Sequence, residues 1–435
     1  MQKIYFETLG CSKNQVDSEK MLYLLQENDY NITENPEEAD YIIINTCCFI
    51  KSAKEEAIET IFELSEYKTT GNCKKLIVAG CMAQYYSAEL KKEIPEIDAI
   101  FGIGDLSKII DAVEKEDTII LPESTKDSLY KRTLTTYPGS AYLKISDGCS
   151  NYCSYCIIPH IRGALRSREI NDILKETDYL IKNNIKEINI ISQDSANYGI
   201  DLFDKKKLPE LLLKIDELLK ADQWIRLLYM HPDHIDNEFL LTLKEVKHLV
   251  PYFDIPFQSG SEKILKLMNR KGNREIYLEL INNIRDIFGD AIIRSTFITG
   301  FPCETIDDFK ETLTFIKEAK IEWIGGFTYS QEEDTKAGNM KEQIKESFKK
   351  KRLDTVIELS EEICKKKLQR FINSNQKILI EERVEGEDLF IGRFWGQAPE
   401  VDGLTVIESA NAKPGDFLNT TIKKLNDKDF YAVEV

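Results

Sequence analysis

Three cysteines close together in the sequence, Cys149, Cys153 and Cys156, form the pattern with the most definite chemical meaning. Three thiolates on one short loop can each bind one iron of a four-iron, four-sulfur cluster, which leaves the fourth iron without a protein ligand. An open iron of this kind can bind the amino and carboxylate groups of S-adenosylmethionine, whose C–S bond an electron from the cluster can cleave. Cysteine loops also bind zinc or form disulfides, but zinc commonly takes separated pairs of ligands, and the chain has no second CxxC or HxxxH pair. The spacing therefore favours a cluster that binds S-adenosylmethionine.

A second set of three cysteines lies in the first 81 residues, each just after a short apolar run. Between the runs, apolar residues recur at helical spacing, so this segment predicts alternating strands and helices with an open parallel sheet. The carboxyl ends of parallel strands meet at one edge of the sheet, where ligands bind. A single cysteine is more often a buried thiol, but the shared position predicts that these three form a second site. The runs are residues 4–8, 41–45 and 76–79, and the cysteines that follow them are Cys11, Cys47 and Cys81.

Four other cysteines are given smaller roles. Cys48 directly follows Cys47, and neighbouring side chains of an extended chain point to opposite sides, so we expect only one of them to be a ligand and favour Cys47. Cys73 precedes the third apolar run and is interpreted as incidental. Cys303 and Cys364 are interpreted as packing residues.

The middle of the chain contains six further apolar runs that alternate with amphipathic helical stretches, which predicts an incomplete TIM-like barrel of six βα units. Such barrels carry their chemistry at the carboxyl ends of the strands, and the loop of Cys149 follows the first run. Gln193 and Asp194 follow the second run. Gln258 follows the fourth run and Gly300 the fifth, so we expect all of them to face one mouth. The six runs are residues 142–146, 187–192, 225–229, 253–257, 292–298 and 323–329.

Basic residues follow the three-cysteine loop, namely Arg162, Arg166 and Arg168. Arginines in such a segment are usually solvated, but their place next to the loop leads us to expect that at least one meets an anion at the mouth. The histidines form no metal-binding pair at helical spacing, and we interpret each as a surface or loop residue. They are His160, His231, His234 and His248.

The C-terminal part has a different sequence pattern. Five short strand-like runs are separated by Gly, Asp and Pro turns, which predicts a small antiparallel β-barrel. From Arg370 onward it has eight Lys or Arg against twelve Asp or Glu, a balance poorly suited to binding phosphate. We therefore divide the chain into five segments. These are an N-terminal sheet domain (1–120), a linker (121–139), the central barrel (140–335), a helical connector (336–370) and the C-terminal barrel (371–435).

Composition restricts the class of protein. A length of 435 residues suggests two to four domains, and 42% hydrophobic with 31% charged residues is typical of a globular protein. No secretion signal and no apolar run of membrane-spanning length are visible, so we expect a cytoplasmic protein without a membrane partner. The net charge of −17 argues against a protein that wraps nucleic acid and favours a basic protein partner.

With these motifs, the sequence resembles the radical S-adenosylmethionine methylthiotransferases along essentially its whole length. Those enzymes combine an N-terminal domain carrying three cysteines, a central radical domain with CxxxCxxC and a C-terminal TRAM barrel. The resemblance implies two four-iron, four-sulfur clusters, an auxiliary one held by Cys11, Cys47 and Cys81, and a radical one held by Cys149, Cys153 and Cys156. It also implies that Tyr155 lies near the adenine of S-adenosylmethionine. The chain departs from the family pattern at Cys48, Ser259 and Cys303, where Gly, His and Gly are usual.

Local motifs resemble the RimO type, which modifies a ribosomal protein, more than the MiaB type, which modifies an isopentenylated adenosine of tRNA. Residues 9–19 read LGCSKNQVDSE, whereas the tRNA branch tends to read YGCQMN. Residues 193–199 read QDSANYG and resemble the RimO motif QDTTxYG. Residues 329–335 read YSQEEDT, and residues 398–403 read APEVDG, both of which are RimO-like.

The RimO type implies addition of a methylthio group to the β-carbon of an aspartate in the twelfth small-subunit ribosomal protein. One S-adenosylmethionine would yield a 5′-deoxyadenosyl radical that removes the hydrogen, the auxiliary cluster would supply sulfur, and a second S-adenosylmethionine would methylate it. The implied partners are the basic ribosomal protein and an electron donor such as a flavodoxin or ferredoxin, and a nucleic acid substrate is not expected. The tRNA reaction of the MiaB type and a non-catalytic two-cluster electron carrier remain the alternatives.

Overall fold

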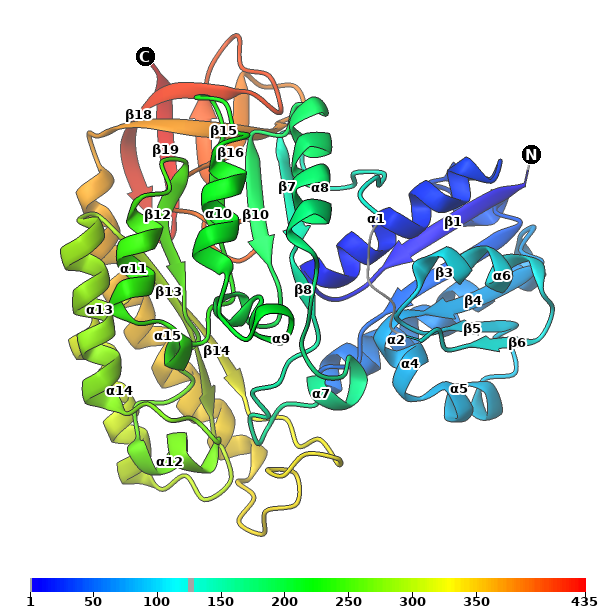
Figure 1. Ribbon diagram of the computed structural model, residues 1–435, viewed down its shortest axis with the longest axis horizontal. Helices are drawn as coiled ribbons and strands as arrows, with labels where there is room; N and C mark the ends of the chain where they lie inside the picture. Colours follow the sequence, from blue (N-terminus) through cyan, green and yellow to red (C-terminus); the bar gives the residue numbers. More distant parts are fainter. Residues whose placement is uncertain (1, 124–128) are drawn as a thin grey trace.

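A parallel sheet with helices on both faces forms the N-terminal part of the computed structural model, which describes residues 2–123 and 129–435 (Figure 1). Its strand order is β2-β1-β3-β4-β5-β6, and every neighbouring pair is parallel. The strands are β1 (Lys3–Thr8), β2 (Asn31–Thr33), β3 (Tyr41–Thr46), β4 (Lys75–Ala79), β5 (Ala99–Phe101) and β6 (Thr118–Ile120). This confirms the predicted open parallel sheet, including the three strands that precede Cys11, Cys47 and Cys81.

Helices cover both faces of this sheet because its strands carry apolar side chains on both sides. On one face, α1 (Ser12–Glu27) and α6 (Ile109–Glu114) pack against Ile43 and Ile77. On the other face, α2 (Lys51–Ser65) and α4 (Gly80–Tyr85) pack against a second layer of strand side chains. The remaining helices of this part are α3 (Tyr67–Thr70) and α5 (Ser87–Glu93).

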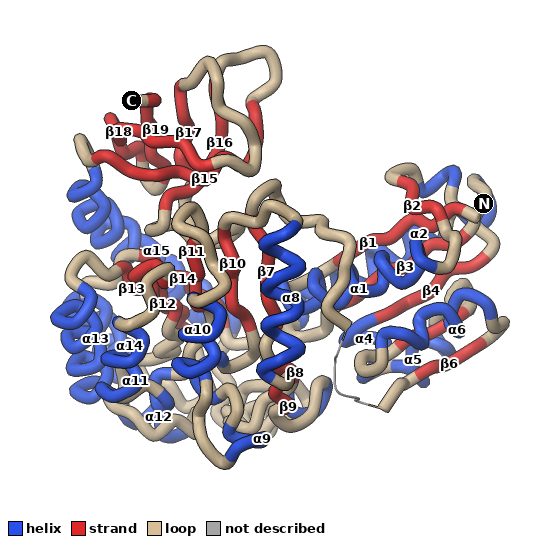
Figure 2. The backbone as a smooth tube through the Cα atoms, turned by 45° about the horizontal axis from the view of Figure 1, so that its top comes forward, coloured by secondary structure: helices blue, strands red, loops and turns tan. Residues whose placement is uncertain are grey.

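The central part is a second parallel sheet that stays open, with strand order β14-β13-β12-β11-β10-β7 (Figure 2). All six predicted strands are present, which confirms the incomplete barrel. They are β7 (Ser140–Lys144), β10 (Glu187–Ile191), β11 (Trp224–Leu227), β12 (Leu249–Asp254), β13 (Ile292–Thr299) and β14 (Trp323–Thr328). The outer helices are α8 (Ile170–Lys182), α10 (Leu208–Asp216), α11 (Asn237–Lys244), α13 (Arg274–Phe288), α14 (Ile306–Ala319) and α15 (Glu346–Leu368).

Shorter elements at the strand ends shape the mouth of the central part. They are β8 (Ser146–Asp147), α7 (Ile158–Ile161), β9 (Arg166–Ser167), α9 (Ile200–Phe203) and α12 (Glu262–Leu267). The core between the sheet and the outer helices is rich in rings, and Phe315 on α14 packs against Phe257, Phe297 and Tyr277. This packing fixes the strands whose carboxyl ends carry the candidate site.

Five strands form a closed C-terminal barrel in the order β15-β16-β17-β19-β18. They are β15 (Asn375–Arg383), β16 (Leu389–Phe394), β17 (Thr405–Glu408), β18 (Phe417–Asn426) and β19 (Asp429–Glu434). The predicted barrel is confirmed, although the pair β17–β19 is parallel while the other pairs are antiparallel. In a closed ring of five strands, the strand direction cannot alternate at every neighbour because five is odd, so at least one neighbouring pair is parallel.

The barrel is joined to the central sheet by buried polar contacts. Arg393 of β16 pairs with Glu187, 2.7 Å away at the start of β10, and Arg226 of β11 pairs with the same carboxylate. The loop after β16 reaches further along the sheet, where Asp402 lies 3.4 Å from Nε of Arg294 and accepts a hydrogen bond from Tyr252. Among the described residues, no helix has the length and apolar character needed to cross a membrane.

Candidate functional site

The loop of Cys149, Cys153 and Cys156 follows β7 and β8 and is held by backbone hydrogen bonds. The N–H of Cys149 donates to the carbonyl of Gly163 at 3.1 Å, and the N–H of Ser154 donates to Met268 at 3.1 Å. All three thiols are free and partly buried. Burial raises the pKa of Cys149 to about 12 and raises the pKa of Cys156 strongly, and the other thiols of the loop add to the effect for both. The loop is therefore a compact group of three sulfurs.

Asp194, immediately after Gln193, fixes this loop against the mouth. Its carboxylate accepts a hydrogen bond from Asn151 at 2.9 Å and another from the N–H of His231 at 3.1 Å, and it lies 2.7 Å from Nδ1 of His234. His231 lies in a loop, as the sequence predicts, but it is buried rather than at the surface, with Nε2 4.0 Å from Sγ of Cys153. Burial and the nearby Arg270 lower the pKa of His231 to about 3, so its imidazole is neutral. Its place directly beyond β11 was the available sequence signal.

Tyr155 packs beside the same loop in a small apolar cluster with Met268 and Phe301. Its hydroxyl accepts a hydrogen bond from the buried Arg270 at 3.1 Å, which also donates to the carbonyl of Pro256. The ring is thus fixed at the edge of the three-cysteine loop. Contact with an adenine stays a prediction.

Two glutamine amides lie at the strand ends, as the sequence predicts for the mouth. Gln193 donates to Asp147 at 3.2 Å, and Gln258 is held in a left-handed backbone conformation by hydrogen bonds to strand β13. The side-chain oxygens of both are buried and, within residues 2–123 and 129–435, have no hydrogen-bond partner. Gly300 has φ +71°, and a Cβ there would lie 2.4 Å from Cγ of Lys349, so its local role is to allow α15 to approach.

The N-terminal sheet brings Cys11, Cys47 and Cys81 to one edge, because β1, β3 and β4 are parallel neighbours. Gly10 lets Cys47 approach Cys11. Its φ is +93°, and a Cβ at this position would lie 2.6 Å from the Cβ of Cys47. Burial raises the pKa of Cys81 to about 12; the nearby Arg162 opposes this shift, and the thiols of Cys11 and Cys47 add to it. Cys48 is more deeply buried than Cys47 and packs against α2.

Asn14 ties the loops of this edge together. Its amide nitrogen donates to the carbonyls of Leu9 and Thr46, and its oxygen accepts from Sγ of Cys81 at 3.6 Å and from Arg162 at 2.6 Å. Three loops of the N-terminal sheet and one arginine of the central part thus meet at one amide.

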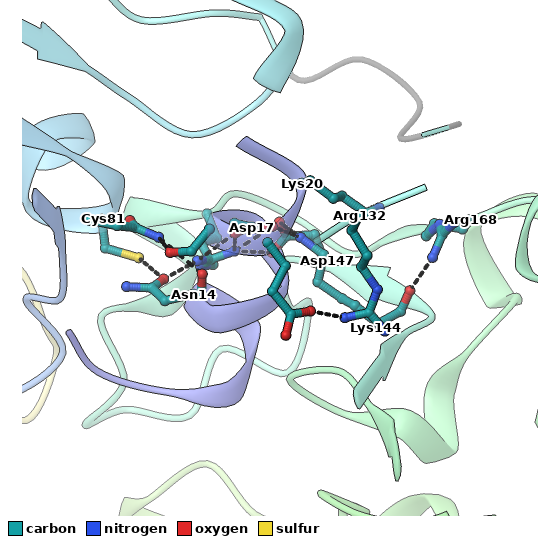
Figure 3. Close-up of polar contacts among 12 residues, drawn as sticks. Asn14, Asp17, Lys20, Cys81, Arg132, Lys144, Asp147 and Arg168 are labelled. Carbon is teal, nitrogen blue, oxygen red and sulfur yellow. Dashed lines mark hydrogen bonds and ion pairs between the residues drawn. The ribbon is translucent and has the colours of Figure 1, made fainter. Parts of the chain in front are cut away.

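Arg162 connects the N-terminal cysteine group to the segment that follows the Cys149 loop (Figure 3 labels its partners Asn14, Asp17 and Asp147). It follows α7, which comes after the Cys149 loop and packs against α4, the helix that contains Cys81. Its guanidinium lies 2.9 Å from Asp147 and 3.3 Å from Asp17. Arg162 is buried, so it is not solvated as arginines in such a segment usually are. Its pairs with Asp147 and Asp17 are the contact with anionic groups that was expected of at least one of the three arginines.

A second set of buried charges lies further along α1 (Figure 3). Arg132, within the segment predicted as a linker, pairs with Glu19 of α1 and lies 3.1 Å from Glu176 of α8. Arg168, also buried, lies 2.7 Å from Glu176, and Lys20 lies 3.8 Å from it. Residues 124–128 of that segment lie outside the described residues.

Lys13 is the other charged residue of α1 at the mouth. Its side chain is buried, and Nζ lies 3.1 Å from the centre of the Tyr229 ring. Tyr229 follows β11, and its hydroxyl lies 3.4 Å from Oγ of Ser12. Burial lowers the pKa of Lys13 to about 8, while the nearby Cys11 and Asp254 oppose the shift.

The donor sets fit iron–sulfur clusters in their chemistry. Each contains three free thiols on one loop or sheet edge, and thiolates are the usual ligands of such clusters. Within the described ranges, no group of three His, Cys, Asp or Glu side chains surrounds a single ion-sized point. A cluster spreads its ligands over separate irons, so this arrangement differs from that of a single-ion site.

Family comparisons cover the three parts of the fold. Residues 3–102 match the Uncharacterized protein family UPF0004, residues 143–316 match the Radical SAM superfamily, and residues 372–435 match the TRAM domain. The structure is also similar to the radical S-adenosylmethionine methyltransferase TsrM from Kitasatospora setae, with a TM-score of 0.57 over 78% of this chain and 77% of that chain. At 12% identity, this likeness concerns the fold.

Relatives at higher identity span the whole chain. Ribosomal protein uS12 methylthiotransferase RimO of Clostridioides difficile (strain 630) is 44% identical over 99% of this chain and 98% of its own length. The protein of the same name from Thermotoga maritima is 39% identical over 99% of both chains. The chain therefore belongs to the family of RimO ribosomal protein uS12 methylthiotransferases.

Proposed function

We propose that this protein adds a methylthio group to the β-carbon of one aspartate of ribosomal protein uS12, using two S-adenosylmethionine molecules per turnover. One observation carries the proposal: the chain has two groups of three free cysteines in neighbouring domains, and a short chain of contacts connects them. Asn14 bonds both Cys81 and Arg162, and the carbonyl of Gly163, the residue after Arg162, accepts from the N–H of Cys149. Relatives that bear this activity in their names support the choice of substrate.

The six cysteines are the proposed ligands of two four-iron, four-sulfur clusters. Cys149, Cys153 and Cys156 would hold the cluster that binds S-adenosylmethionine, and Cys11, Cys47 and Cys81 the auxiliary cluster. When bound, these groups supply the removal of an unactivated hydrogen and the transfer of sulfur, which lie beyond the reach of side-chain acids and bases.

The chain's own residues bind and orient. Asp194 holds the three-cysteine loop through Asn151, and the neutral His231 lies against Cys153 and keeps that side of the loop covered. The unpaired oxygens of Gln193 and Gln258 are suited to accept hydrogen bonds from S-adenosylmethionine. Tyr155 and Gly300 are the other proposed residues of that cofactor site, the first through its ring and the second through its backbone.

The proposed partners follow from charge and chemistry. A chain of net charge −17 with an acidic C-terminal barrel suits a basic ribosomal protein better than tRNA. The reaction needs electrons from outside, for which we propose a small donor such as a flavodoxin or ferredoxin. We place the enzyme in the cytoplasm, where ribosomal proteins are available.

Two measurements test the proposal. The anaerobically reconstituted enzyme is incubated with a uS12 peptide or with isopentenylated tRNA, and mass spectrometry should find one added methylthio group on the aspartate peptide. A gain on the tRNA alone would refute the substrate assignment. Iron and sulfide analysis of the variant Cys149→Ala/Cys153→Ala/Cys156→Ala should find about half the wild-type content. Complete loss of iron in this variant would contradict the assignment of Cys11, Cys47 and Cys81.

A further inference from the structure

Lys13 is a buried cation that forms no ion pair with any residue the structure describes. Its residue is 7% exposed, and its ammonium lies over the face of the Tyr229 ring. Within the part of the chain that the structure describes, the side chain of Lys13 makes no hydrogen bond or ion pair. A buried ammonium is costly unless it is paired, and a ring face compensates for only part of that cost. The position is therefore prepared for a negatively charged group that is absent from the chain itself.

Two carboxylates near Lys13, Asp254 and Asp147, already have other partners. Asp254 accepts a hydrogen bond from the N–H of Tyr229 at 3.1 Å and lies 3.5 Å from Arg294. Asp147 is paired with Arg162 at 2.9 Å and also accepts from the N–H of Gly148. Neither carboxylate is within ion-pair distance of Lys13, so the ammonium remains available.

The start of α1 adds a second attraction for an anion at this place. The helix has no side-chain N-cap and no acidic residue in its first turn. The positive end of the helix dipole thus lies at Cys11 without an acidic side chain in the first turn, and Lys13 is the second residue of the helix.

Lys13 is connected to both cysteine groups. It lies two residues after Cys11 in one cysteine group, and its partner Tyr229 lies two residues before His231, which contacts Cys153 in the other. A substrate side chain that is to lose hydrogen and gain sulfur must enter between these two groups.

We propose that the ammonium of Lys13 binds the side-chain carboxylate of the substrate aspartate and thereby selects aspartate over uncharged residues. This assignment rests on the proposed function. It agrees with the sequence motifs, because the tRNA branch tends to carry methionine where this chain has Lys13 in LGCSKN. A positive charge at this point suits a carboxylate and has no purpose toward an isopentenylated base.

The test compares wild type with Lys13→Met, which keeps the length and apolar stem of the side chain but removes the charge. Both reconstituted enzymes receive the uS12 peptide with its target aspartate and the same peptide with asparagine in its place. Peptide affinity is measured by fluorescence anisotropy without S-adenosylmethionine, and S-adenosylmethionine affinity is measured separately. Iron content and the absorption spectrum verify that the clusters are intact.

We expect Lys13→Met to lower kcat/KM for the aspartate peptide by about 10- to 100-fold, the range of a lost charge-assisted hydrogen bond, mostly through KM. The weak binding of the asparagine peptide should not change, so the preference for aspartate disappears. Lys244→Met, which removes a lysine over the Phe288 ring on the outer helix α11, is the matched control and should keep the full preference.

Three outcomes would overturn the assignment or its basis. A Lys13→Met enzyme that retains the preference for aspartate shows that the lysine only packs against Tyr229. A loss of S-adenosylmethionine affinity with unchanged peptide affinity shows that Lys13 holds the carboxylate of the cofactor instead. A wild-type enzyme that neither binds nor modifies the aspartate peptide refutes the proposed function, and this assignment falls with it.

Discussion

Replacing Arg132 by methionine tests whether buried charges hold the N-terminal and central parts together. The guanidinium pairs with Glu19 of α1 and with Glu176 of α8, and it donates to the carbonyl of Tyr142. All three charged side chains are fully buried. Glu176 keeps Arg168 as a partner in the variant, whereas the carboxylate of Glu19 keeps, among the described residues, the polar contacts from Thr135.

The expected cost follows from the carboxylate that is left behind. Removing one partner of a buried ion pair costs about 3–5 kcal/mol, because the other charge stays buried without compensation. The second substitution Glu19→Gln in the Arg132→Met background should recover part of this loss, since the remaining group is then neutral.

Hydrogen–deuterium exchange of α1 is the appropriate assay, because a chain of several domains does not unfold in two states, whereas exchange reports local opening. The free energy of opening of α1 should fall by about 3–5 kcal/mol in Arg132→Met. Arg383→Met breaks an exposed pair with Asp388 and should change the opening of β15 by less than about 1 kcal/mol. A decrease of less than about 1 kcal/mol at α1 would refute the reasoning that these charges hold the interface.

Three further outcomes are expected. Phe315→Ala should lower the free energy of opening of α14, measured by hydrogen–deuterium exchange, by about 3–5 kcal/mol, whereas the exposed Phe62→Ala should have little effect on the opening of α2; equal effects would contradict the core assignment. Glu187→Gln should lower Tm at neutral pH and make Tm depend less on pH in the acid range. Burial raises the pKa of Glu187, but the charges of Arg393 and Arg226 outweigh burial and hold this pKa far below its usual range. Its stabilisation is therefore present above about pH 4 and is lost as the pH falls below that value; an unchanged Tm–pH curve would contradict this. Gly10→Ala should reduce bound iron because its Cβ would collide with Cys47, whereas Gly386→Ala, also at positive φ but in open space, should not; equal iron contents would contradict the clash.

The strands were predictable because most of their apolar side chains are buried, and a run of apolar residues is a local signal. The runs before Cys11, Cys47 and Cys81 are the strands β1, β3 and β4, and the six central runs are the six strands of the open sheet. Three short strands, β2, β5 and β6, have only three residues each, too few to produce a recognisable period.

The polar surroundings of the site could not be predicted from local patterns. Asp17, Glu19 and Lys20 look like the solvated side of α1, yet all three are buried, because their partners come from the central part and from the segment before β7. Burial of a charge depends on where its counter-charge lies, and that information is distributed over distant parts of the chain. For His231 a local signal existed, because it follows a strand, but the interpretation as a surface or loop residue did not use it.

The contact between Arg294 and Asp402 limits what can be learned by dissecting the protein. Arg294 links Asp402 of the C-terminal barrel to Asp254, the carboxylate that holds the backbone of Tyr229 under Lys13. Deleting the barrel would therefore alter the wall beneath the proposed substrate pocket, even if the barrel never touched the substrate. The three domains are not interchangeable modules, and a barrel exchanged between relatives must bring the loop of residues 398–403 with it.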